Sequence, residues 1–174
     1  MLFLLVVLLF SALVEAQTSG RKPDKEQTLF GAEDESRERP VKLSDGVLEL
    51  LRKDEQVLRY LAATQKSANE LTTESFLASE VHLDGPTEAD LIVMGDGRLR
   101  GANVATFWIF RKLPEGYRLV LKITTFGLTV ERSRWKGLRN ISIASPKAGY
   151  SVEDFFRFNG EKYEHFRTKS ELIK

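Results

Sequence analysis

From Ser79 onward, apolar and polar residues alternate with a strand-like period, and turn-forming residues interrupt the alternation about every ten residues. Successive side chains of a strand point to opposite faces, so this pattern is typical of short strands joined by tight turns. We predict strands at residues 79–83, 89–94, 106–112, 117–125, 128–134, 139–144, 152–158 and 163–166. Turns are indicated by Asp84-Gly85-Pro86, Gly95-Asp96-Gly97, Pro114-Glu115-Gly116, Lys136-Gly137 and Asn159-Gly160. The pattern predicts an antiparallel meander.

Two of these segments differ in how their apolar residues are placed. In residues 117–125, one side of the alternation is apolar and the other is largely polar, which predicts one buried and one solvated face. In residues 106–112, Phe107 and Ile109 fall on one side while Trp108 and Phe110 fall on the other. We therefore expect this strand to lie centrally and to be covered on both faces.

An amphipathic helix precedes the strands. It begins at Ser44 or Asp45 as N-cap and runs to about Ala63. Its apolar positions recur at helical spacing and are Val47, Leu50, Leu51, Val57, Leu58 and Leu61. Such a stripe favours packing against a sheet. We predict a single α+β domain over residues 41–174, with an N-terminal amphipathic helix packed on a mostly antiparallel meander sheet of about seven or eight strands.

The first 40 residues have a different character. Residues 1–16 resemble a secretion signal, because an apolar run from Leu2 to Phe10 is followed by small Ala16, after which cleavage is expected. The run is too short to span a bilayer, although an uncleaved signal that tethers the domain to a membrane is an alternative. Residues 17–40 carry dense charges of both signs and predict a disordered leader.

Composition narrows the class of protein. The chain has no cysteine, so disulfides and thiol nucleophiles are excluded, and an exported protein of this kind suits a bacterial envelope or secreted domain. The net charge is +1, which argues against nucleic acid as a partner and against binding to an anionic membrane surface. A membrane is expected only through an uncleaved signal.

The chain resembles a set of uncharacterised bacterial secreted or periplasmic proteins with recurring sequence blocks. Asp-Leu-Ile-Val, Gly-Tyr-x-Leu-Val-Leu and Phe-Asp-Gly-x-x-Tyr are three of them. The six matching segments are Asp90 to Val93, Gly101 to Asn103, Thr106 to Phe110, Gly116 to Leu121, Gly137 to Ile141 and Phe158 to Tyr163. Asn140 and Asn159 stand where the pattern has Asp, and both residue types suit turns. The resemblance implies a fold and no established activity.

One predicted hairpin concentrates positive charge beside an aromatic residue. Its candidate partner-binding residues are Arg132, Arg134, Trp135, Lys136 and Arg139. A tryptophan flanked by arginines is a common contact for a partner protein or a glycan. The alternative is a solvated turn whose tryptophan folds back over the sheet edge.

Motifs for catalysis, cofactors and metals are lacking. The two histidines, His82 and His165, lie far apart and in no ligand spacing, so no metal or cofactor is expected. Four acids crowd around one predicted hairpin, at Asp84, Glu88, Asp90 and Asp96. Oxygen ligands of this kind suit calcium, but their spacing matches no calcium loop, and solvated turn acids are the favoured interpretation.

The leading expectation is an exported, non-catalytic binding or accessory module of the bacterial envelope, whose partner is an envelope protein or a glycan. One alternative is a small hydrolase that uses carboxylates brought together by folding. Another is an inhibitor of an envelope-attacking enzyme, in which the loop from Gly95 to Asn103 plugs a foreign active site.

Overall fold

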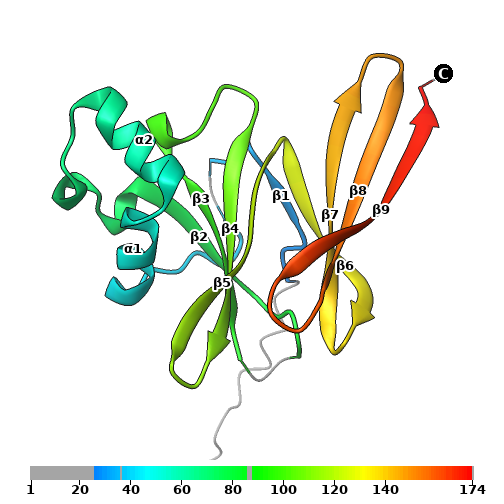
Figure 1. Ribbon diagram of the computed structural model, residues 1–174, viewed down its shortest axis with the longest axis horizontal. Coiled ribbons are helices and arrows are strands. Elements are labelled where there is room, and N and C mark those ends of the chain that lie inside the picture. The colour runs from blue at the N-terminus through cyan, green and yellow to red at the C-terminus, as the bar shows by residue number, and fades with distance from the viewer. Residues whose placement is uncertain (1–25, 36, 86–87, 174) are drawn as a thin grey trace, which may run out of the picture.

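The computed structural model describes residues 26–35, 37–85 and 88–173, which form a mixed α+β fold of three layers (Figure 1). Two antiparallel sheets pack face to face, and two α-helices cover the outer face of one of them. The four-stranded sheet has the order β2-β3-β4-β5, from strands β2 (Phe76–Val81), β3 (Asp90–Gly95), β4 (Ala105–Leu113) and β5 (Gly116–Thr125). The five-stranded sheet has the order β1-β6-β7-β8-β9, from β1 (Leu29–Gly31), β6 (Gly127–Trp135), β7 (Leu138–Lys147), β8 (Tyr150–Phe158) and β9 (Tyr163–Leu172).

The eight strands predicted from the sequence are present as β2 to β9, but they do not form one meander sheet. The chain leaves the first sheet at Thr125 and enters the second at Gly127, and β5 and β6 do not pair with each other. Their side chains instead meet across the space between the sheets, where Val120 and Leu121 of β5 and Leu128 of β6 belong to one core. The single predicted sheet is therefore corrected to two packed sheets.

The strand β4 lies inside its sheet and is buried on both faces, as its sequence predicted. Phe107 and Ile109 belong to the core between the two sheets. Trp108 and Phe110 belong to a second core beneath the helices. A register shift between Ile109 and Phe110 interrupts the pairing with β5. The cover on the inner face is the second sheet, which the sequence did not indicate.

The single predicted helix is two helices, α1 (Asp45–Arg52) and α2 (Glu55–Thr64). Asp54 separates them, because its extended backbone ends the first and its side chain accepts a hydrogen bond from the Gln56 amide at the start of the second. The Asp54 carboxylate also pairs with Lys122 of β5 at 2.8 Å. This ion pair joins the helices to the sheet below them. The described residues also contain three short 3₁₀ turns, at Ala68–Glu70, Thr73–Ser75 and Gly97–Leu99.

The C-terminal part of the predicted leader belongs to the fold. Residues 29–31 form β1, which pairs with β6 at the edge of the five-stranded sheet. Phe30 is completely buried in the core between the sheets, and the buried Arg37 lies over its ring and pairs with Asp34 at 3.1 Å. One aromatic anchor thus orders a segment that is otherwise polar. The predicted signal and residues 17–25 lie outside the described residues.

Among the described residues, no helix has the length and apolar character needed to cross a membrane.

Candidate functional site

The candidate hairpin is formed by β6 and β7. Lys136 and Gly137 occupy its two-residue turn with φ values of 48° and 85°, as expected for a tight antiparallel hairpin. The structure divides the five predicted residues between two places. Arg132, Arg134 and Arg139 line a pocket, whereas Trp135 and Lys136 do not.

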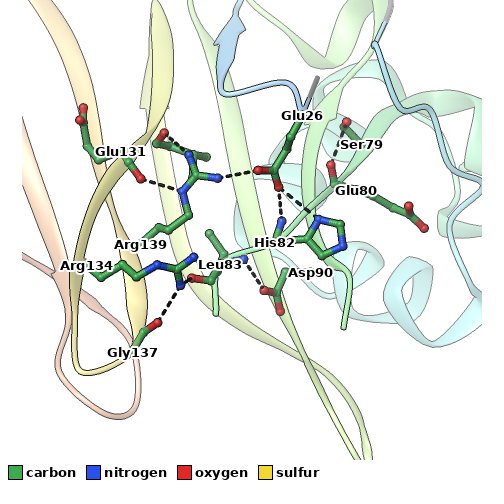
Figure 2. Close-up of polar contacts among 11 residues, drawn as sticks. Glu26, Ser79, Glu80, His82, Leu83, Asp90, Glu131, Arg134, Gly137 and Arg139 are labelled. Atoms are coloured by element: carbon green, nitrogen blue, oxygen red, sulfur yellow. Dashed lines mark hydrogen bonds and ion pairs between the residues drawn. The ribbon is translucent and has the colours of Figure 1, made fainter. Parts of the chain in front are cut away.

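The pocket has a volume of about 850 Å³ and lies where three segments distant in sequence meet (Figure 2). One wall is β6, from Thr129 to Arg134, together with Arg139 of β7. The residues that follow β2 contribute His82 and Gly85. The segment around β1 contributes Glu26, Thr28 and Arg39.

Arg139 is the structural centre of the pocket wall. A register shift in β6 between Val130 and Arg134 leaves backbone carbonyls free to accept its donors. The guanidinium donates to the carbonyls of Glu131 at 2.7 Å and Val130 at 2.8 Å, and it pairs with Glu26 at 2.6 Å. Because Arg139 is buried and all of these bonds are internal, it holds β6, β7 and the N-terminal segment together.

Glu26 completes this connection. One carboxylate oxygen pairs with Arg139, and the other accepts a hydrogen bond from the His82 amide at 2.6 Å and lies 3.2 Å from the His82 Nδ1. Figure 2 shows the carboxylate between the two side chains. Glu26 therefore links both sheets, and its charge is already compensated.

The other arginines of the pocket form fewer hydrogen bonds and ion pairs within the protein than Arg139 does. Arg134 is exposed and donates to the carbonyls of Leu83 and Gly137 at 2.9 and 3.0 Å. Arg132 is exposed and Arg39 partly so, and neither guanidinium makes a hydrogen bond or an ion pair with any residue that the structure describes. The remaining acid, Glu131, accepts a hydrogen bond from Ser142 at 2.6 Å. The pocket thus carries an excess of positive charge.

Asp90 lies beside this region but is buried. Its two oxygens accept hydrogen bonds from the backbone amides of Leu83 at 3.0 Å and Lys112 at 2.9 Å. Burial raises the pKa of Asp90 to about 6, even though the two amide hydrogen bonds act in the opposite direction. The nearby Tyr163 hydroxyl donates to the Arg139 carbonyl at 2.7 Å, and burial raises the pKa of Tyr163 well above its usual value. These groups brace the strands and do not line the pocket.

The two remaining hairpin residues lie elsewhere. Lys136 donates to the carbonyl of Asn159 at 2.7 Å, which joins the hairpin to the turn between β8 and β9. Trp135 is 45% exposed, and the guanidinium of Arg157 lies 4.7 Å from its ring centroid.

Three of the four acids considered for calcium, Asp84, Asp90 and Asp96, each have separate partners, and Glu88 is exposed. Asp84 pairs with Arg111 at 3.4 Å, and Asp96 accepts from the Gly97 amide at the start of a 3₁₀ turn. His165 lies 3.3 Å from Asp154, away from His82. Within the described ranges, no group of three or more His, Cys, Asp or Glu side chains is placed to hold a metal ion.

Comparison with known proteins finds no family model, no curated protein and no solved structure that matches this chain. The sequence blocks that carry the resemblance noted above fall on β3, β4, β5, the loop before β4, and the turns that lead into β7 and β9. They therefore coincide with core strands and turns, and most of the pocket lies outside them.

Sequence reasoning missed the part of the pocket that comes from outside the hairpin. Glu26 and Arg39 belong to the predicted leader, and His82 follows a strand of the other sheet. Their sequence neighbourhoods contain no signal that would place them beside β6, because the contacts depend on how the two sheets pack.

Proposed function

We propose that this protein is an exported, non-catalytic binding module that holds an anionic group of an envelope partner in the pocket beside β6. The observation that carries this proposal is the pair of guanidiniums, Arg39 and Arg132, that line the pocket without an acidic partner among the described residues.

The pocket chemistry suits a carboxylate, sulfate or phosphate group. Guanidinium presents a planar set of N–H donors that matches such anions in bidentate geometry. The hydroxyls of Thr28 and Ser133 line the same space and add neutral polar groups. The charge of Glu26 is compensated by its ion pair with Arg139, and Glu131 accepts a hydrogen bond from the Ser142 hydroxyl.

The hydrolase alternative receives less support. A carboxylate mechanism requires two accessible acids with suitably shifted pKa values. Asp90 is the acid whose pKa is raised among the described residues, yet it is buried and both its oxygens accept hydrogen bonds from backbone amides.

The inhibitor alternative also receives less support. In the loop considered for it, Leu99 is buried and Arg100 donates to the carbonyls of Ala32 and Asp34. Much of that loop is thus held against the domain.

Calorimetric titration of the purified chain with sodium glucuronate, sulfate and phosphate tests the pocket. We expect saturable binding of at least one of these anions and none of neutral glucose. The double change Arg39→Ala and Arg132→Ala should weaken binding by about tenfold or more, because a hydrogen bond to a charged group contributes roughly 1.5–3 kcal/mol. Arg118→Ala, an exposed arginine on β5 outside the pocket, should bind as the wild type does. Binding of no anion, or equal weakening by Arg118→Ala, contradicts the proposal.

Export is tested by expressing the full chain in a bacterial host and measuring the mass of the product in each fraction. We expect a periplasmic or secreted product that begins at Gln17, because Ala16 ends the predicted signal. An uncleaved chain confined to the cytoplasm would overturn this part of the proposal.

A further inference from the structure

The five-stranded sheet carries a second concentration of arginine and aromatic side chains, which is distinct from the pocket. Arg157 of β8 lies over the rings of both Trp135 of β6 and Phe166 of β9, at 4.7 and 5.2 Å from their centroids. Arg167 of β9 lies over Phe166 and Phe155, at 5.9 and 4.0 Å. We call these five residues the arginine–aromatic ladder. Trp135 and Phe166 are 45% and 38% exposed, and both arginines are exposed.

The guanidiniums of the ladder are stacked but not neutralised. Arg157 is the cross-strand partner of Glu164, yet it makes no ion pair with that residue and lies over the two rings instead. Arg167 is the cross-strand partner of Phe155, and within the described chain it too has no ion pair. Two positive charges are therefore displayed on adjacent strands of one sheet.

Stacking prepares these arginines to bind an anion. A ring beneath a guanidinium restricts its orientation and leaves the N–H edges in the plane available to a ligand. Part of the side-chain entropy has been lost before binding, so less entropy is lost when each hydrogen bond to a ligand forms. Two such forks on neighbouring strands suit a ligand that carries more than one negative charge.

We propose that the ladder is a binding surface for a carboxylated polysaccharide. Guanidinium forks match carboxylates. The ladder draws its side chains from β6, β8 and the edge strand β9, so the ligand meets side chains of several strands. Nucleic acid suits the surface less well. Arginines already cover ring faces on which bases would stack.

Tryptophan fluorescence tests the proposal, because the chain has two tryptophans and Trp108 is buried while Trp135 belongs to the ladder. Polygalacturonate is the probe and neutral dextran is the blank. We expect a saturable change in emission with polygalacturonate, and Trp135→Phe should abolish the change. The double variant Arg157→Lys and Arg167→Lys keeps both charges but loses the forks, so its affinity should fall about tenfold or more. Arg118→Ala is the matched control and should behave as the wild type.

Several results would overturn the ladder proposal. Undiminished binding by the double lysine variant would show that net charge alone attracts the polymer. Equal or tighter binding of poly-L-glutamate or single-stranded DNA would assign the surface to another class of ligand. The pocket variant, Arg39→Ala with Arg132→Ala, should retain polygalacturonate binding. If that variant alone loses binding, the ladder proposal fails while the pocket proposal stands. The pocket proposal fails on its own test, when the calorimetric titration detects no binding of the small anions.

Discussion

Arg139 and Arg132 lie in the same hairpin, but their surroundings give them different roles. A buried guanidinium is stable only when its donors are satisfied, and Arg139 meets this condition through two carbonyls and Glu26. Arg132 is exposed and forms no such bonds within the described residues, so its donors are available to a ligand. The sequence shows four basic residues around Trp135, and it does not show which of them the fold itself uses.

The buried carboxyl group of Asp90 makes the free energy of unfolding depend on pH. Its pKa is about 6 in the folded protein and near its ordinary value of 3.8 in the unfolded chain. Between these values the folded state binds more protons, so the contribution of Asp90 to the free energy of unfolding decreases as pH rises from about 4 to about 6. The decrease is on the order of 3 kcal/mol.

Asp90→Asn should remove this dependence. Chemical denaturation at several pH values should show that the wild type loses more stability than the variant as pH rises from 4 to 6.5. Glu88→Gln, an exposed acid in the loop before β3, is the control and should follow the wild-type profile. Parallel profiles for Asp90→Asn and the wild type would contradict the raised pKa.

At the scale of elements, local patterns predicted strands well and their partners poorly. The alternation and the turn residues identify β2 to β9, because both signals lie within each segment. The assignment of β5 and β6 to different sheets depends on burial of Val120 and Leu128 across the core, which is a long-range contact. The division of the helix at Asp54 had a local signal, since aspartate is a common N-cap, but the apolar spacing continues past it.

The element that the sequence predicted least well is β1. Its three residues could not be distinguished from a charged leader by composition, because one residue, Phe30, supplies almost all of its buried apolar surface. The pocket was not predicted for the same reason. Glu26 and Arg39 flank β1, and they reach β6 only when β1 is paired with it.

Phe30→Ala should therefore destabilise the whole domain. Phe30 is completely buried, and removing such a ring costs about 3–5 kcal/mol. Its neighbour Leu29 is 66% exposed, so Leu29→Ala should change the free energy of unfolding by less than about 0.5 kcal/mol. Urea denaturation of the two variants makes the comparison, and equal stabilities would mean that β1 does not contribute to the core.

In the molecule as a whole, one sheet is covered on both faces and the other carries the candidate binding surfaces. The four-stranded sheet is covered by helices on one side and by the second sheet on the other. The five-stranded sheet presents both candidate binding surfaces, the pocket beside β6 and the ladder across β6, β8 and β9. Packing of the two sheets brings Glu26, His82 and Arg139 together, and a single sheet could not create that pocket.

NMR mapping of a bound anion shows whether the pocket beside β6 is the binding site. Glucuronate, sulfate and phosphate are titrated in turn into isotopically labelled protein, and the backbone amide shifts are followed residue by residue. We expect the largest changes at residues 129–134 and at His82 and Gly85, which line the pocket. Changes centred on α1 and α2, or no saturable change at any amide, would contradict it.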